Sequence, residues 1–492
     1  MLRSKGLLLF SIVFAASCYG QNIVMFLTDD QDVVLGGMTP MKNVQRFIAD
    51  NGVVFTNSYA ASPICCPSRS SILTGKYIHN HGTYGNSVSA GCYGVHWKSQ
   101  ENDTFAAILH NAGYNTFYAG KYLNEYGVSS GGGEVPPGWG EWHGLVGNSR
   151  YYNYTVSNNG VPTYSRDLYL TDTIRSLSLS FIDKQSSAER SNFLMVLAPP
   201  APHAPFTPAD RHKGVYANVS ALRSPSFNVK ADDKHWLIRM PPTPLPEALM
   251  PELDRVYRSR WEALLAVDEM VADVVNALEV NNLLEDTYLV FTSDNGYHVG
   301  QFSQVYDKRQ PYETDIKVPL VISGPGIPKN TINADPVINI DLAPTILSMA
   351  KLAPPKTMDG RVIDLYAQNK TKERNMLITY YGEGNTKTVD ANCTWKYDGK
   401  NLAECYPDFS CKCQDARNNT YGCLRHFADN VDAKYCKFSD NERFEEHYDL
   451  LSDPHELTNT IDQLFPSVKM FYNNLLRALL HCSGDGCDQL ST

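Results

Sequence analysis

The sequence of 492 residues has no apolar run long enough to cross a membrane after its first twenty residues. It also lacks an excess of positive charge: 43 lysines and arginines face 53 aspartates and glutamates, which gives a formal net charge of −10. Proteins that grip nucleic acid need a net basic face, so we expect no nucleic-acid partner. Charged residues make up 20% and hydrophobic residues 43%, which is typical of a folded globular chain and excludes a largely disordered one.

The first twenty residues have the pattern of a secretory signal peptide. Arg3 and Lys5 form a basic start, and an apolar run follows at residues 6–16. Small residues near Gly20 offer a cleavage point before Gln21. A membrane anchor is the alternative, but the run is short for a bilayer. We therefore expect a signal peptide at residues 1–20, no membrane anchor in the mature chain, and a lysosomal or secreted protein that passes through the endoplasmic reticulum.

Sequons and cysteines both fit this secretory route. Six asparagines in N-x-[ST] sequons are predicted to be glycosylated, namely Asn102, Asn153, Asn218, Asn369, Asn392 and Asn418. Of twelve cysteines, eight gather near the C-terminus, namely Cys393, Cys405, Cys411, Cys413, Cys423, Cys436, Cys482 and Cys487. In an oxidising compartment this cluster predicts a disulfide framework, and a zinc site is the alternative. Upstream, Cys65, Cys66 and Cys92 form an odd set that needs a chemical explanation.

Short apolar runs alternate with helical patterns along the chain. Buried strands are predicted at residues 22–28, 192–198, 288–292 and 319–323. A helix is expected at 41–50, and apolar residues from Trp261 to Leu278 recur at helical spacing. This alternation predicts an α/β fold with a mostly parallel central sheet flanked by helices. We expect a large domain at residues 21–374, which carries the chemistry, and a smaller cysteine-rich α+β subdomain at residues 375–492.

Acidic side chains directly follow two of these strands. Asp29 and Asp30 come after the first strand, and Asp294 and Asn295 follow the strand at 288–292. In open α/β sheets ligands bind beyond the carboxyl ends of strands, so we expect these groups to converge. Three carboxylates and an amide oxygen form an all-oxygen site for a hard cation, Ca²⁺ or Mg²⁺. The alternative is that Asp30 and Asp294 only cap the following turns or helices.

A cysteine-containing motif favours the metal site. Residues 65–69 are Cys-Cys-Pro-Ser-Arg, and Leu-Thr-Gly follows at 73–75. This matches the C-x-P-S-R-x-x-x-L-T-G pattern of the sulfatase family, and a second signature of that family, G-Y-x-T-x-x-x-G-K, runs from Gly113 to Lys121. The chain thus resembles the sulfatases over nearly the whole mature sequence. The resemblance implies an alkaline-phosphatase-like sulfatase fold, hydrolysis of sulfate esters and a bound divalent cation, with Ca²⁺ favoured over Mg²⁺.

The resemblance gives Cys65 a specific role beside the metal. In sulfatases the motif cysteine is converted to formylglycine by the formylglycine-generating enzyme, and its hydrated aldehyde supplies the hydroxyl that attacks sulfur. Arg69 is expected to hold the formylglycine and the metal-side carboxylates. The odd cysteine count is then explained, because removing Cys65, and Cys18 with the signal peptide, leaves ten cysteines for disulfides.

The family pattern also implies which side chains contact the substrate. Lys121, Lys308 and His203 match positions that bind sulfate, where fixed positive charge stabilises the transition state. Many sulfatases place a proton-donating histidine two residues after the signature lysine, but this chain has Leu123 there. We predict that His298, three residues after Asn295, donates the proton to the leaving alcohol instead.

Several segments are similar to those of the N-acetylglucosamine-6-sulfatases, namely residues 120–126, 234–239, 293–298 and 307–313. Extracellular endosulfatases share some of these segments but carry a long basic insertion that this chain lacks. The resemblance therefore implies exo-acting removal of the 6-sulfate from terminal N-acetylglucosamine in heparan or keratan sulfate. The alternatives are an endosulfatase or arylsulfatase substrate, a phosphoryl-transfer enzyme with a Ser or Thr nucleophile, and a non-catalytic sulfoglycan-binding homologue in which Cys65 stays unmodified.

Overall fold

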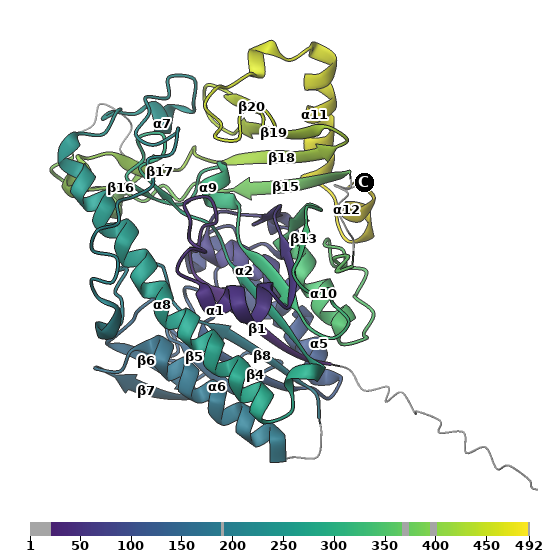
Figure 1. The fold of residues 1–492 in the computed structure, drawn as a ribbon. Coiled ribbons are helices and arrows are strands. Elements are labelled where there is room, and N and C mark those ends of the chain that lie inside the picture. Colours follow the sequence, from purple (N-terminus) through teal and green to yellow (C-terminus); the bar gives the residue numbers. More distant parts are fainter. Residues whose placement is uncertain (1–20, 188–190, 367–372, 394–400, 491–492) are drawn as a thin grey trace, which may run out of the picture.

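A computed structural model describes residues 21–187, 191–366, 373–393 and 401–490. The predicted signal peptide at residues 1–20 and the sequon at Asn369 lie outside these ranges. A large sheet with helices on both faces forms the main body, and a smaller sheet with its own helix lies beside it (Figure 1). Within the described ranges, no helix combines the length and apolar character needed to cross a membrane.

The large sheet has ten strands in the order β13-β2-β12-β9-β1-β8-β4-β5-β6-β7. Their bounds are β1 Asn22–Thr28, β2 Gly52–Phe55, β4 Asn115–Lys121, β5 Glu141–Leu145, β6 Tyr154–Asn158, β7 Val161–Ser165, β8 Phe193–Ala198, β9 Thr287–Ser293, β12 Leu320–Ser323 and β13 Thr331–Asn333. The central strands from β9 to β5 are all parallel, whereas β12, β6 and β7 pair antiparallel with their neighbours. The predicted parallel centre is confirmed, and the sheet as a whole is mixed.

Helices cover both faces of this sheet, which explains why its strands are apolar throughout. In β1, Ile23 and Met25 contact one hydrophobic core, while Val24 and Phe26 contact the other. On one face lie α1 (Lys42–Val44), α6 (Leu170–Ser187) and α8 (Met250–Val280), and on the other α2 (Cys65–Thr74), α5 (Phe105–Asn111) and α10 (Leu342–Met349) (Figure 1). The helix expected at 41–50 is divided into α1 and a π-helix at Gln45–Ala49.

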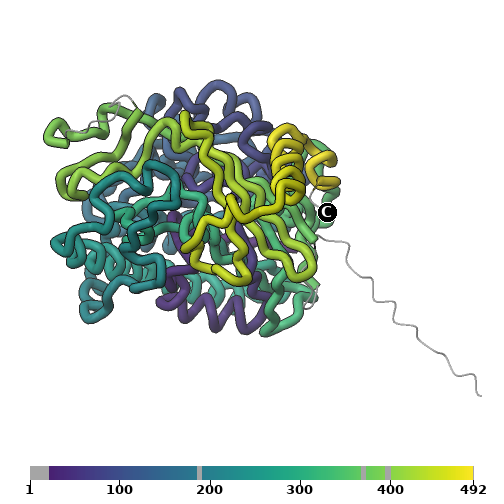
Figure 2. Tube along the Cα trace, turned by 90° about the horizontal axis from the view of Figure 1, so that it is seen from above, coloured from purple at the N-terminus to yellow at the C-terminus, as the bar shows by residue number. Residues whose placement is uncertain are grey.

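The smaller sheet is antiparallel and comes from the C-terminal part of the chain. It consists of β15 (Arg374–Tyr380), β18 (Tyr421–Ala428), β19 (Val431–Phe438) and β20 (Glu445–Asp449), and α11 (Pro466–Leu479) packs against it. Seen from above, this part lies over the rest of the molecule (Figure 2). The division into domains at residue 374 stays a prediction, although β15 begins at that residue.

Among residues 21–490, where the structure describes every cysteine, the cysteines pair as disulfides and leave one thiol free. Four bonds join the C-terminal cysteines, namely Cys393–Cys411, Cys405–Cys413, Cys423–Cys436 and Cys482–Cys487. The disulfide framework is therefore confirmed and the zinc alternative is wrong. Cys66 bonds to Cys92, and Cys65 is the free cysteine of the described residues. The odd cysteine of the upstream set is thus the first cysteine of the sulfatase-like motif.

Candidate active site

The site lies where β1 and β9 end side by side. Thr28 pairs with Ser293 in parallel register, so the residues that follow both strands emerge at the same edge of the sheet. The backbone N–H of Asp30 donates to Asp294 Oδ1 at 3.0 Å, and Asn295 Nδ2 donates to Asp30 Oδ1 at 2.7 Å. All four predicted metal-side groups, including Asp29, are buried and lie together.

Helix α2 presents Cys65 to these carboxylates from its first residue. The Cys65 Sγ lies 3.9 Å from Asp30 Oδ1, and the side chain is fully buried. Burial raises the pKa of the Cys65 thiol to about 12, although Lys121 and Lys308 oppose the shift. The thiol is consequently neutral near pH 7 and, as it stands, a poor nucleophile.

Three buried cations balance the three buried carboxylates. Arg69 Nε donates to Asp294 Oδ2 at 2.8 Å, and its Nη1 donates to the carbonyl oxygen of Lys121 at 2.7 Å. Lys121, the last residue of β4, places its Nζ 2.8 Å from Asp29 Oδ2. The Nζ of Lys308 lies 2.6 Å from Asp30 Oδ2. Such pairing offsets the cost of burying charge, and it concentrates positive charge where a sulfate could bind.

The pKa values of the carboxylates follow from this competition between burial and charge. Burial alone would raise the pKa of Asp29, but Lys121, His203 and Arg69 together hold it well below its ordinary value. At Asp294 burial prevails over Arg69 and raises the pKa to about 6. The two carboxylates therefore differ in basicity although both are fully buried.

His203, one of the two predicted histidines, contacts a carboxylate of this group. His203 Nε2 lies 3.8 Å from Asp30 Oδ2, and its Nδ1 contacts the carbonyl oxygen of Ala204 at 2.6 Å. Burial and the nearby Lys308 lower the pKa of His203 to about 4, so the ring is neutral. With Nδ1 as the donor to Ala204, Nε2 presents a lone pair to the site.

His298 lies in a different environment. It is in β10 (His298–Val299), and its Nδ1 lies 3.0 Å from both carboxylate oxygens of Asp315 in α9 (Glu313–Ile316). Its Nε2 is buried and has no hydrogen-bond partner among the described residues. Within the described residues, no ion pair or hydrogen bond connects His298 to Cys65. The role of His298 as proton donor stays a prediction.

The residues at this edge fit a hard cation. One potential ligand atom each from Asp29, Asp30, Cys65 and His203 lies within 4.8 Å of the others. Asn295 Oδ1 is buried and has no hydrogen-bond partner in the described structure, as expected for an oxygen that awaits a ligand. Carboxylate and amide oxygens suit Ca²⁺ or Mg²⁺. His203 is therefore also a candidate metal ligand, whereas its sequence motif predicts only sulfate binding.

Sequence reasoning missed two side chains of the site. Ser149 Oγ donates to Asp29 Oδ2 from the loop after β5. Arg260 in α8 donates from Nη2 to the carbonyl oxygen of Asp30 at 2.7 Å and to Asp32 Oδ1 at 2.8 Å. A lone serine in a loop and one arginine in a long helix carry no sequence signal, because only the fold brings them to the aspartates.

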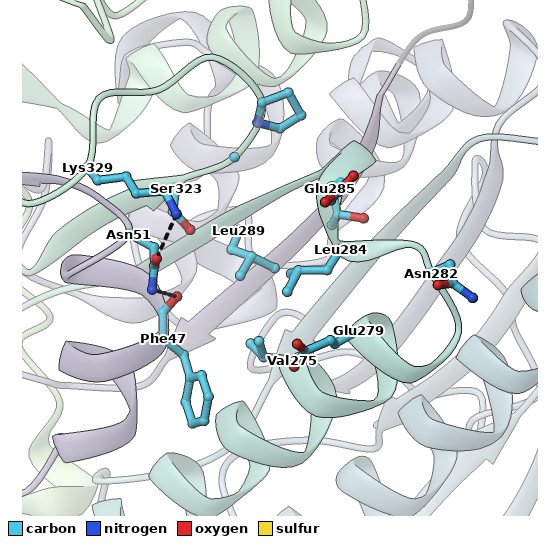
Figure 3. A pocket seen from close by; sticks show the side chains of 13 residues that line it. Phe47, Asn51, Val275, Glu279, Asn282, Leu284, Glu285, Leu289, Ser323 and Lys329 are labelled. Atoms are coloured by element: carbon cyan, nitrogen blue, oxygen red, sulfur yellow. Dashed lines mark hydrogen bonds between the residues drawn. The ribbon is translucent and has the colours of Figure 1, made fainter.

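Two sizeable cavities lie in very different places. One cavity, of about 610 Å³, is lined by residues that lie close in sequence to site residues: Asn124 is near Lys121, and Arg309 follows Lys308. Another cavity, of about 680 Å³, lies near the start of β9, and Thr287 and Ser323 are among its lining residues. Lys329, which also lines it, donates a hydrogen bond to Asn51 (Figure 3). Because the chemistry is at the opposite, carboxyl end of β9, the first cavity is the candidate substrate pocket.

Comparison with known proteins identifies the family. The profile described as "Sulfatase" matches residues 21–352. The chain belongs to the sulfatase family. A second profile, "N-sulphoglucosamine sulphohydrolase, C-terminal", matches residues 300–410. The predicted family, the sulfatase fold and the enzyme class of sulfuric ester hydrolases are confirmed.

Among similar curated proteins are N-acetylglucosamine-6-sulfatases of two mammals. That of Capra hircus is 46% identical over 479 residues, covering 95% of this chain and 84% of that protein. That of Homo sapiens is 46% identical over 486 residues, covering 96% of this chain and 87% of that protein. A solved structure of a protein in complex with its substrate D-glucosamine-2-N,6-O-disulfate has a TM-score of 0.76 and 21% identity, covering 96% of this chain and 98% of that chain. At that identity the structural likeness shows the fold.

Proposed function

We propose that this sulfatase removes the 6-sulfate from terminal N-acetylglucosamine in heparan or keratan sulfate. The observation that carries the chemistry is the buried group of Asp29, Asp30, Cys65 and His203, whose potential ligand atoms lie within 4.8 Å of one another. The 46% identity to N-acetylglucosamine-6-sulfatases over nearly the whole chain supports the substrate.

A divalent cation is part of this proposal, with Ca²⁺ favoured and Mg²⁺ possible by ligand chemistry. Asp29, Asp30, Asp294 and Asn295 would hold it, and their oxygen donors fit a hard ion. When bound, such a cation supplies Lewis-acid stabilisation of negative charge on sulfate oxygens. Arg69 keeps Asp294 and Asp29 oriented through contacts of 2.8 and 3.6 Å, so the ligand positions are fixed before substrate arrives.

Cys65 is the proposed site of formylglycine, made by the formylglycine-generating enzyme during biosynthesis. The modified side chain would supply a hydroxyl nucleophile, which the neutral, buried thiol does not. Three side chains near this position contact its carboxylates: Lys121 pairs with Asp29, and Lys308 and His203 lie beside Asp30. We assign these three side chains to sulfate binding. Buried cations stabilise developing negative charge more strongly than exposed ones, because little water screens them.

We further propose that His298 donates the proton to the leaving alcohol. Asp315 holds Nδ1 with contacts of 3.0 Å, which orients the ring, while Nε2 has no hydrogen-bond partner among the described residues. The pH–rate profile of His298→Ala tests this role. We expect the variant to lose the part of the pH–rate profile that reports the proton donor, while Cys65 is still converted to formylglycine. An unchanged profile would refute the role of His298.

The secretory route remains part of the proposal, with the protein in the lysosome or outside the cell. Four predicted glycosylation sites are exposed, namely Asn102, Asn153, Asn218 and Asn392, whereas Asn418 is half-buried. Tyr164 donates to Asn153 Oδ1 at 3.0 Å, which leaves the Asn153 Nδ2 available for a glycan. Peptide mass mapping of protein made in animal cells locates the occupied sites.

The decisive experiment uses the full chain expressed in animal cells, which can convert Cys65. Sulfate release is measured from an oligosaccharide with non-reducing N-acetylglucosamine-6-sulfate, and peptide mass reports the state of Cys65. We expect release by the wild type, none by Cys65→Ala, and loss on chelation that added Ca²⁺ restores. If no sulfate is released although Cys65 has been converted to formylglycine, the proposed substrate is wrong. Assays with an aryl sulfate and with an internal 6-sulfate then distinguish the arylsulfatase and endosulfatase alternatives. Unconverted Cys65 without release would favour a sulfoglycan-binding protein.

A further inference from the structure

The candidate substrate pocket is shared by the large sheet and the C-terminal part of the chain. Loop residues 84–90 form one wall, and the segment 381–385 after β15 forms another. The hairpin of β16 (Leu402–Cys405) and β17 (Cys413–Ala416) contributes Glu404 and Asp415 to the lining. Its volume of about 610 Å³ is within the usual range of small-molecule sites and leaves room for more than one sugar ring.

This pocket adjoins the proposed sulfate site along several chain segments. Asn124 comes three residues after Lys121, and Arg309 directly follows Lys308. Asn86 Oδ1 accepts the backbone N–H of Cys66 at 2.9 Å. The pocket therefore lies next to the proposed sulfate site, and it is the space that we assign to the rest of a sugar whose sulfate reaches Cys65 and the two lysines.

The lining of the pocket carries a net negative charge, whereas each carboxylate of the sulfate site is paired with a buried cation. The charged residues among its lining are Glu125, Glu383, Glu404, Asp415 and Arg309, so four negative charges face one positive charge, a formal −3. The asymmetry suits a ligand with negative charge at one end and neutral groups elsewhere. A second anionic group in the pocket would meet like charges in a poorly screened space.

Arg309 does not offer its charge to such a second anion. Its guanidinium Nη1 contacts Asp307 Oδ2, its Nη2 lies 3.7 Å from Glu383, and its Nε lies 3.8 Å from Asp415. Glu383 and Asp415 also accept backbone or hydroxyl hydrogen bonds that fix them in place. Glu125 and Glu404 are half-buried, and no lysine or arginine pairs with them in the described structure. Of the four acidic residues, these two therefore have the least compensation of their negative charge.

We propose that this pocket selects oligosaccharides in which the 6-sulfate is the only anionic group near the cleavage site, so that a neutral neighbouring hexose is preferred to a uronic acid. The inference rests on the proposed function and narrows its substrate. Between the two glycan types, it favours keratan-type chains, whose sugars are neutral apart from sulfate, over uronate-containing chains of the heparan type.

The test compares two disaccharides that differ in one charge. Both carry non-reducing N-acetylglucosamine-6-sulfate; the second sugar is glucuronic acid in one, and in the other its carboxyl group is reduced to a hydroxymethyl group. Initial rates of sulfate release at pH 7, above the pKa of about 6 to which burial raises Asp415, give kcat/KM for each. We expect the neutral disaccharide to be favoured about fivefold in the wild type at low salt.

Charge-neutralising variants identify the source of the preference. The double variant Glu125→Gln, Glu404→Gln is expected to bring the ratio of the two kcat/KM values to about one, mainly by faster cleavage of the glucuronate disaccharide. Glu279→Gln, in the remote cavity of Figure 3, is the matched control and should leave the ratio unchanged. A wild-type ratio of one or less, or a ratio that the double variant does not change, overturns the inference. If neither disaccharide releases sulfate, the proposed function itself fails.

Discussion

Glu101 provides a sensitive test of the electrostatics deduced for the interior. Its side chain is 4% exposed, and its Oε1 accepts the indole N–H of Trp97 at 2.9 Å. Lys98 lies 3.9 Å from the other oxygen but is itself partly exposed. Burial outweighs both partners and raises the pKa of Glu101 to about 7.

The raised pKa has a definite consequence for stability. The folded state binds a proton more tightly than the unfolded state, whose glutamate pKa is about 4.5, so this contribution to stability is present at low pH. It is lost as the pH rises from about 4.5 through about 7, and ionised Glu101 then costs about 3 kcal/mol. Glu101→Gln removes the titration and keeps a carbonyl oxygen for Trp97.

The measurement is the free energy of unfolding, or the thermal midpoint, of both proteins at pH 4.5 and pH 8. We expect Glu101→Gln to match the wild type within about 1 kcal/mol at pH 4.5 and to be more stable by about 1–3 kcal/mol at pH 8, since its amide must also find an acceptor. Glu247→Gln, at an exposed position, is the control and should change stability by less than about 0.5 kcal/mol. A variant that is less stable than wild type at pH 8, or a difference independent of pH, would refute the reasoning.

Two further predictions concern the stability contributed by one disulfide and one buried ion pair. Replacing both Cys66 and Cys92 by Ser opens a crosslink with a sequence separation of 26 residues and should lower stability by about 3 kcal/mol, measured by denaturant unfolding against the wild type. Arg374→Met leaves Asp341 buried without its 2.6 Å partner and should cost about 3–5 kcal/mol. Adding Asp341→Asn should recover part of that loss; no recovery would show that the cost lies in packing.

The strands and the main site were largely predictable because their signals are local. Strands buried on both faces are continuously apolar, and β1, β8, β9 and β12 were predicted within a residue or two of their observed bounds. Acidic residues placed directly after β1 and β9 must meet if these strands pair in parallel, and Thr28 does pair with Ser293. The two strands are separated by more than 250 residues, so the pairing itself could be expected only from the fold class.

Other parts of the site depended on contacts without a local signal. Ser149 reaches Asp29 from a loop, and Arg260 reaches Asp30 from the middle of α8. The role of His298 was predicted from its distance in sequence to Asn295, but the contact of its Nδ1 with Asp315 is seen only in the structure. Sequence spacing gives the position of a backbone along a strand, but the direction of a side chain depends on which partners surround it.

By itself the sequence determined the class of fold, the proposed nucleophile position Cys65 and the acidic groups that follow two strands, because each is carried by a short apolar run or a contiguous motif. The odd number of upstream cysteines needed an explanation, which the family resemblance supplied at Cys65, but the sequence did not show which partners the other cysteines take. The tertiary structure decided the disulfide pairs, the contacts of Lys121 and Lys308 with separate aspartates, and the acidic pocket with Glu404 and Asp415. These are properties of distance and burial between segments far apart in the chain, and folding alone sets them.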